Sequence, residues 1–196
     1  PFDRARRVCF LAGTMSDRTL PEGRLRARDQ ARTFHIVLLE PEIPPNTGNI
    51  ARLCGATRAA LHLVGTLGFS IDEHAVRRAG LDYWHLVEVR HHPDLQAAAR
   101  CIGELGGAAD PARWWWFSGK ATRSWFEVDS ALGDVLVFGK ESVGLPEELL
   151  ARYPERVVGL PTLGEVRSLN LANSVSAALY EALRRAGALA VDSDRR

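Results

Sequence analysis

From Phe34 onward, short apolar runs alternate with amphipathic segments, and this alternation constrains the fold more than any other feature of the sequence. The runs have the length of strands, and the segments between them carry apolar residues at helical spacing. Such alternation over about 150 residues predicts an α/β domain whose mainly parallel sheet has helices on both faces. Strands are expected at 34–40, 61–64, 86–89, 114–118, 134–138 and 156–160, and helices at 47–58, 72–79, 93–105, 146–153 and 169–186.

The chain is expected to form a single domain over residues 33–190, preceded by a segment of different character. Residues 1–32 carry eight arginines against four acidic residues and show no sustained apolar period. This composition predicts a flexible, arginine-rich extension. Since the formal charge of the whole chain is +1, the remaining residues carry a net negative charge. A nucleic-acid partner would therefore have to contact a local basic patch or the extension.

The cysteines and the apolar runs bear on the compartment. Cys9, Cys54 and Cys101 are odd in number and widely spaced. They match neither a disulfide framework nor the spacing of a metal site, which favours a reduced, cytoplasmic setting. The apolar runs are too short to cross a bilayer and no secretory leader is recognised, so we expect neither a membrane location nor secretion.

A group of histidines and a run of tryptophans suggest a metal site and a nucleobase-stacking surface, and the sequence favours neither. His85, His91 and His92 have no acidic or cysteine residues beside them in the sequence, so no metal site is expected. Residues 114–117 (WWWF) could stack on nucleobases. Because alternate residues of a strand point to opposite faces, one alternating pair of this run is instead expected in the core.

In parallel sheets, ligands bind beyond the carboxyl ends of the strands, so the loops there carry the functional signal. The first such loop spans residues 40–52. Asn46 or Thr47 is expected to cap the helix that follows. Arg52 stands one helical turn after Gly48 and is expected to face the same opening. It could clamp a phosphate or orient a hydroxyl there, and the alternative is an ordinary surface arginine.

The second loop, residues 138–146, places Gly139 and Gly144 on either side of polar residues. It is not a phosphate-binding loop of nucleotide hydrolases, because Glu141 stands where Ser or Thr would be required. It is not the nucleophile elbow of serine hydrolases either, because Ser142 is one residue too far from Gly139. A glycine-lined pocket for a flat or polar ligand remains.

The third loop, residues 160–173, leads into the long last helix. Ser168 is expected to cap that helix and to leave free N–H groups for an anion or carboxylate. Asn170 and Asn173 share a helix face at this spacing. Their amides either line a site or serve only the backbone of the helix start.

Taken together, the three loops resemble the signature motifs of the SPOUT RNA methyltransferases, in the TrmH-type branch. The first motif is PPNTGNIAR at 44–52, the second is FG followed by GLP at 138–146, and the third is LP followed by RSLNL at 160–171. The resemblance extends from residue 34 to residue 185. It is tightest to the small TrmL-like tRNA (cytidine/uridine-2′-O-)-methyltransferases, which lack an added RNA-binding domain.

The resemblance implies a fold and an activity. It implies a trefoil knot in which the C-terminal segment threads through a loop, and a homodimer that completes the substrate site. It implies transfer of a methyl group from S-adenosyl-L-methionine to the wobble ribose of tRNA, with S-adenosyl-L-homocysteine as the product. The partner would be the anticodon stem-loop, with no DNA. The alternatives are another tRNA or rRNA ribose, or a non-catalytic RNA-binding protein with the same fold.

The resemblance also implies roles for individual residues. Arg52 takes the position of the catalytic arginine. Since arginine stays protonated, we expect it to stabilise the developing alkoxide or to hold a phosphate rather than to act as a base. Lys140 departs from the proline that relatives often carry, and it could add a contact to an RNA phosphate. The supporting catalytic positions are Asn46, Glu141 and Asn170, the cofactor positions are Phe117, Gly139, Gly144, Leu160 and Ser168, and no metal is implied.

Overall fold

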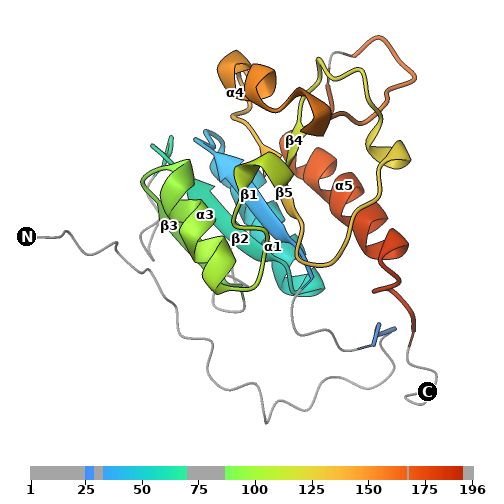
Figure 1. Cartoon of the computed structure of the whole chain (residues 1–196). Helices are drawn as coiled ribbons and strands as arrows, with labels where there is room; N and C mark the ends of the chain where they lie inside the picture. Colours follow the sequence, from blue (N-terminus) through green and yellow to red (C-terminus); the bar gives the residue numbers. More distant parts are fainter. Residues whose placement is uncertain (1–24, 29–32, 70–86, 167, 192–196) are drawn as a thin grey trace, which may run out of the picture.

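The computed structural model describes residues 25–28, 33–69, 87–166 and 168–191. Within them a six-stranded sheet runs in the order β3-β2-β1-β5-β4-β6, and every pairing is parallel (Figure 1). The strands are β1 His35–Leu39, β2 Ala60–Val64, β3 Val89–His92, β4 Trp115–Phe117, β5 Val135–Phe138 and β6 Val157–Val158. The helices are α1 Pro44–Thr57, α3 Leu95–Glu104, α4 Glu147–Arg152 and α5 Leu171–Arg185, with short 3-10 turns at Pro111–Arg113, Trp125–Glu127 and Pro154–Arg156.

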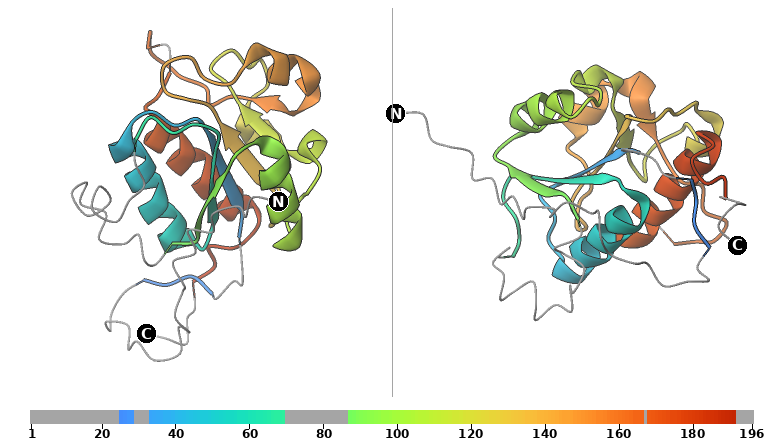
Figure 2. Two further views of the ribbon diagram at one scale, coloured as in Figure 1. Left: turned by 90° about the vertical axis from the view of Figure 1, so that its left-hand side faces the viewer. Right: turned by 90° about the horizontal axis from the view of Figure 1, so that it is seen from below.

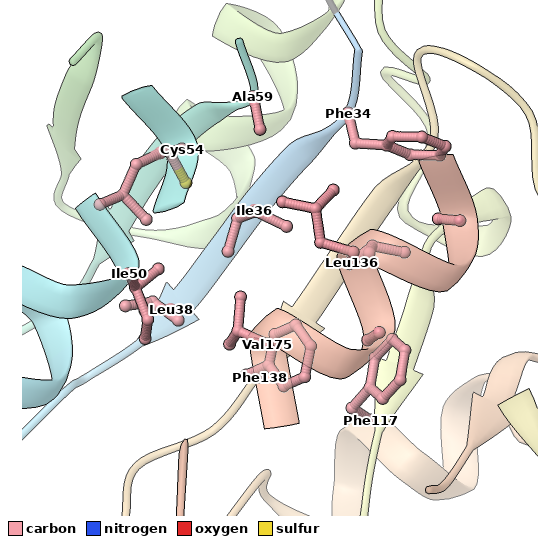
Figure 3. Packing of buried hydrophobic residues seen from close by; sticks show 14 of the residues in the cluster. Phe34, Ile36, Leu38, Ile50, Cys54, Ala59, Phe117, Leu136, Phe138 and Val175 are labelled. Carbon is pink, nitrogen blue, oxygen red and sulfur yellow. The ribbon is translucent and has the colours of Figure 1, made fainter. Parts of the chain in front are cut away.

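Helices cover both faces of this sheet, which confirms the predicted fold class. Helices α1 and α5 pack against each other on one face, and α3 and α4 lie over the other (Figure 2). Strand β1 is central and shows why the apolar runs are continuous. Its Ile36 and Leu38 join the core under α1 and α5 (Figure 3). Its Val37 joins the core under α3. A strand buried on both faces has no polar alternation.

The tryptophan run is more buried than predicted. Trp115 and Phe117 join the core under α1 and α5, whereas Trp114 and Trp116 join the core under α3 and α4. At least one alternating pair was expected in a core, and the structure buries both pairs. Since both faces of the sheet are covered, both pairs are buried and none of the four side chains is available on the surface to stack on nucleobases.

Helix α1 begins earlier than predicted and is not capped as expected. It starts at Pro44, and its N-cap residue Ile43 makes no side-chain hydrogen bond to the helix. Asn46 and Thr47, the predicted caps, lie inside the first turn and are buried. A proline pair suits the first turn because its missing N–H groups need no partner there. The cap that local sequence did not supply comes from a distant carboxylate, described below.

Helix α5 is capped by a different residue from the one predicted. The side chain of Asn170 accepts hydrogen bonds from Ala172 N and Asn173 N at 2.9 and 3.4 Å, so Ser168 is not the cap. The predicted stop at Gly187 is confirmed, because Gly187 has φ +68° and follows the last turn. Its N–H bonds to a carbonyl of that turn, as the left-handed glycine cap of a helix requires.

Other differences lie at the edges of the fold. The strand predicted at 86–89 is β3, Val89–His92, which lies further along the chain and pairs in register with β2. The helix predicted at 72–79 and most of the predicted extension over residues 1–32 lie outside the described residues. Of that extension, Ala27 is described and bridges Val191 in antiparallel fashion. None of the helices in the described ranges has the length and apolarity to cross a bilayer. The implied knot stays a prediction.

Candidate active site

A cavity of about 980 Å³ opens where β4, β5 and β6 end. The chain leaves these strands at Ser118, Gly139 and Gly159, and all three line the cavity. This is the sheet edge where the parallel-strand rule places ligands, and the volume is that of a small-molecule site. Of the nine predicted site residues, eight line it: Asn46, Phe117, Gly139, Glu141, Gly144, Leu160, Ser168 and Asn170.

An aromatic pair forms an apolar wall of the cavity. The rings of Phe117 and Phe138 stack with centroids 4.4 Å apart and planes 17° from parallel. They end the adjacent strands β4 and β5, and both side chains are almost fully buried. A flat apolar surface of this kind suits the face of an aromatic or heteroaromatic ligand.

The loop after β5 turns so tightly that it needs glycine. Gly144 N donates to Lys140 O at 2.9 Å, and Gly144 has φ +76°. A Cβ on Gly139 would stand 2.1 Å from the carbonyl carbon of Gly144. Backbone therefore packs directly on backbone, which leaves no room for a side chain at Gly139. The two glycines singled out in the sequence are needed for shape.

The carboxylate of Glu141 joins this turn to the loop before α1. It accepts hydrogen bonds from Glu42 N at 2.8 Å, Ile43 N at 3.3 Å and Asn46 Nδ2 at 3.0 Å. These donors lie at the start of α1, where N–H groups have no partner within the helix. Negative charge is also favourable at a helix N-terminus. Glu141 thus supplies the cap that the residues before α1 lack.

A second carboxylate crosses the same gap in the opposite direction. Glu42 accepts from the backbone N and the Oγ of Ser142, both at 3.0 Å. These hydrogen bonds, with a smaller contribution from the charge of Lys140, lower the pKa of the Glu42 carboxyl. The two loops therefore hold each other through Glu141 and Glu42. Sequence reasoning missed this second contact, because the partners are 100 residues apart.

Asn46 connects these loops to the start of α5. Its Oδ1 accepts from Asn170 Nδ2 at 3.0 Å while its Nδ2 donates to Glu141. Asn170 Oδ1 in turn caps α5. The Asn170 amide therefore serves the helix backbone and also lies at the cavity. One residue from each of the three sequence motifs is present in this network.

Arg52 is the one predicted site residue that does not line the cavity. It lies on the exposed side of α1, although Gly48, one turn earlier, is buried. Gly48 does not line the cavity either, so the opening that Arg52 and Gly48 were expected to share stays a prediction. Six residues separate Arg52 from Asn46, which is about 9 Å along the helix axis. Arg52 is thus placed outside the rim of the cavity, about two turns from the asparagine network.

The two lysines of the chain are both paired with carboxylates. Lys140 Nζ lies 2.7 Å from Glu40, and this hydrogen bond and charge raise the pKa of Lys140. Lys120 pairs with Glu147 at the start of α4 and lowers the pKa of that carboxyl. Both lysines line the cavity. Lys140 therefore ties the end of β1 to the loop after β5, while the phosphate contact considered for it stays a prediction.

Further lining residues were not singled out in the sequence. The segment that follows β4 contributes Gly119, Thr122 and Arg123, and α5 contributes Ser174. The first three follow the end of a strand, so the rule for parallel sheets could have found them. Ser174 follows from no local signal, because only the packing of α5 brings it to the cavity.

The histidines behave differently from the sequence expectation. His91 is exposed and its Nε2 donates to Gly65 O, while His92 is buried. Burial, and secondarily the charge of Arg90, lowers the pKa of His92 to about 4. His85 lies outside the described residues. A cysteine companion that the local sequence lacks is supplied by α3, because Cys101 approaches His92.

Comparison with known proteins agrees with this geometry. A family model described as the SpoU rRNA Methylase family matches residues 33–180. A tRNA (cytidine(34)-2'-O)-methyltransferase of Burkholderia cenocepacia (strain HI2424) is 45% identical over 155 residues, which are 79% of this chain and 96% of the relative. The stretch matched by the family model contains all three loops that line the cavity.

Solved structures give the same picture. One described as "Structural insights into the 2-OH methylation of C/U34 on tRNA" matches with a TM-score of 0.69 and 43% identity, over 79% of this chain and 96% of that chain. A second match is the SpoU methyltransferase AviRb from Streptomyces viridochromogenes in complex with AdoMet. Its TM-score is 0.66 at 24% identity, over 82% of this chain and 60% of that chain. This likeness shows a shared fold. With its family model spanning the sheet and all three loops, the chain belongs to the SpoU methylase family.

Proposed function

We propose that this protein transfers a methyl group from S-adenosylmethionine to the 2′-hydroxyl of the wobble nucleotide of tRNA. The observation that carries the proposal is the convergence of the three loops on one cavity through Glu141, Asn46 and Asn170. The tRNA methyltransferase relative aligns over almost its whole length, so it carries no large extra domain that this chain lacks. A ribose 2′-hydroxyl is absent from DNA, and DNA is therefore not a substrate.

The residues of the cavity fit the proposed methyl donor. The Phe117 and Phe138 pair offers an apolar wall for an adenine ring. Gly139, Leu160 and Ser168 bring loop backbone to the cavity, where N–H and C=O groups can bind the polar edges of a nucleoside. When bound, S-adenosylmethionine supplies a methyl group already activated on a sulfonium. What remains after transfer is S-adenosyl-L-homocysteine.

The protein's own contribution is then positioning and electrostatics. Asn46, Asn170 and Glu141 are held by reciprocal hydrogen bonds, so the cavity wall that meets the ribose is preorganised. Arg52 remains protonated and is not the base. Its role is to hold the adjoining phosphate or to stabilise the alkoxide as the hydroxyl proton leaves.

A homodimer accounts for the distance of Arg52 from the cavity. Within one chain Arg52 lies outside the site, and a second copy can complete it. Exposed apolar side chains are available for such an interface: Leu163, Val166 and Leu169 on the segment before α5, and Tyr180 on α5 itself. Large exposed apolar side chains are the groups that an interface between two copies would bury. Light scattering at micromolar concentration is expected to give the mass of a dimer, and a monomer would exclude this arrangement.

The function is tested by incubating the protein with labelled S-adenosylmethionine and bulk tRNA, followed by nuclease digestion and mass spectrometry. A 2′-O-methylated wobble pyrimidine is expected. The matched control is a tRNA with 2′-deoxyribose at the wobble position, which must accept no label. Label in rRNA or at another tRNA ribose would keep the chemistry and change the substrate. Binding of tRNA without transfer to any RNA would leave an RNA-binding protein.

We place the activity in the cytoplasm, where tRNA is matured.

A further inference from the structure

Three potential metal ligands converge between the sheet and α3, on the side of the sheet formed by β2 and β3 and away from β4, β5 and β6, where the active-site cavity opens. They are His62 on β2, His92 on β3 and Cys101 on α3, and their ligand atoms all lie within 4.8 Å of one another. His62 is fully buried, His92 is 7% exposed and Cys101 is half-buried. The methyl-transfer site uses none of these residues, and the family comparison assigns them no role.

We propose that His62, His92 and Cys101 form a zinc site that fastens β2, β3 and α3 together. Two imidazoles and one thiolate are borderline and soft ligands, which favour zinc over magnesium or calcium. Hard cations require oxygen ligands, and this cluster offers none. Because Cys101 is the most exposed of the three, solvent can reach its side of the site and fill the fourth position.

The distances need only a small adjustment for zinc. Nδ1 of His62 lies 3.0 Å from Nε2 of His92. Tetrahedral zinc, with bonds of about 2.0 Å to nitrogen and about 2.3 Å to sulfur, separates two nitrogens by roughly 3.3 Å and a nitrogen from a sulfur by roughly 3.6 Å. The imidazoles therefore move apart by a few tenths of an ångström, and the sulfur closes on them by up to about 1.2 Å, which a side-chain rotation supplies.

A third histidine orients the first. Nε2 of His62 lies 3.1 Å from Nδ1 of His35 on the neighbouring strand. With His62 Nε2 as the donor, the lone pair of its Nδ1 faces His92 and Cys101. A hydrogen bond to the far ring nitrogen is the usual way in which proteins fix a metal-binding histidine. Gly107 packs against the His35 ring so closely that a Cβ there would stand 2.5 Å from its Nε2.

The proton balance of binding is simple. In the metal-free protein the hydrogen between the two imidazoles belongs to His92 Nε2, and on binding zinc it moves to the other nitrogen of that ring. The Cys101 thiol gives up its proton and becomes the thiolate ligand. Binding of one Zn²⁺ thus releases one proton, and affinity increases with pH.

The test is a titration of the full-length, chelator-treated protein with Co²⁺ and then with Zn²⁺. Cobalt is expected to produce thiolate charge-transfer absorption and the visible bands of tetrahedral coordination at one equivalent, and zinc is expected to abolish both. At a hundredfold excess over its dissociation constant, zinc should raise the melting temperature by about 5 °C or more. Magnesium should leave it unchanged.

Two matched pairs of variants localise the site. Cys101→Ala and His92→Gln should weaken cobalt binding by about a hundredfold or more, whereas Cys54→Ala and His91→Gln should bind as the native protein does. Circular dichroism of each metal-free variant checks that it is folded. The proposal is overturned if native protein gives no thiolate absorption, or if binding survives in the folded Cys101→Ala and His92→Gln variants. Binding of zinc with no change in melting temperature would overturn the fastening role.

Discussion

Asn170 Nδ2 donates to Asn46 Oδ1 over 3.0 Å, so the N-cap residue of α5 is joined to the first turn of α1 across 124 residues of sequence. The same Asn170 caps α5 through its Oδ1. Asn46 cannot turn its amide to suit another partner, because its Nδ2 donates to the carboxylate of Glu141, which only accepts. The orientation of both amides is therefore fixed by the network.

Substituting Asn170 by Asp separates the two roles of this residue. Asp is as good a helix cap as Asn, so Asn170→Asp keeps the cap of α5 and loses only the hydrogen bond to Asn46, which should cost about 1 kcal/mol of unfolding free energy. It replaces the donor facing Asn46 by an acceptor, and methyl transfer should fall about tenfold or more. Asn170→Ala loses the cap as well and should cost about 1 kcal/mol more. Urea unfolding and initial rates measure both effects. Equal rates for Asn170→Asp and native protein would refute a role for this hydrogen bond.

Gly139→Ala should disrupt the turn that borders the cavity. The added methyl would stand 2.1 Å from a backbone carbon of Gly144, which no side-chain movement can relieve. We expect a lower melting temperature and loss of S-adenosylmethionine affinity measured by calorimetry. Gly164→Ala is the matched control, because a Cβ on Gly164 meets nothing within 4 Å. If Gly139→Ala binds as tightly as this control, the turn does not shape the cofactor site.

Glu141→Gln tests whether one carboxylate organises both loops. The glutamine keeps one acceptor oxygen but turns an amide NH₂ toward backbone and side-chain donors at the start of α1. Leaving these donors unpaired should cost about 1–3 kcal/mol of unfolding free energy and slow methyl transfer. Glu148→Gln, an exposed position on α4, is the control for charge removal. Stability equal to that control would show that Glu141 is not a cap for α1.

The location of this site can be predicted from the alternation of strands and helices, because the carboxyl ends of parallel strands meet at one edge of a sheet. The loops after β1, β5 and β6 were singled out for that reason. The nine individual site residues were implied by the resemblance to the SPOUT methyltransferases, and eight of them line one cavity. The covering of both sheet faces likewise followed from strand–helix alternation. These features depend on order along the chain and on periodicity, which a single sequence displays.

What the sequence does not display is pairing between distant side chains. Glu42 and Ser142 hold the two loops together, yet each is an ordinary polar residue in its own segment. The start of α1 was misplaced for the same reason, since its cap comes from Glu141 and not from a neighbour. The approach of His92 to Cys101 arises only when α3 packs over β3. The spacing of residues within one segment cannot predict contacts between segments far apart in the sequence.

Stability should depend on pH through Glu181. Hydrogen bonds from Arg184 and Arg185 hold the pKa of Glu181 at about 2, below its ordinary value of 4.5. The folded state therefore favours the ionised carboxylate. Its contribution is complete above about pH 4.5 and is lost as the pH falls from there toward 2. Urea midpoints at about pH 6 and about pH 3 should differ less for Glu181→Gln than for native protein. An unchanged difference would show that this triad does not respond to pH.

Arg52→Ala should separate cofactor binding from catalysis. Because Arg52 lies outside the cavity of its own chain, its removal should leave S-adenosylmethionine affinity within about twofold of native and lower the rate of methyl transfer by about a hundredfold. Arg52→Lys keeps the charge but not the planar pair of donors, so it should recover only part of the rate. Arg100→Ala, exposed on α3, is the control for loss of a surface arginine. If the rate follows the affinity for tRNA alone, with turnover at saturating tRNA unchanged, Arg52 is a phosphate anchor rather than a group that stabilises the alkoxide.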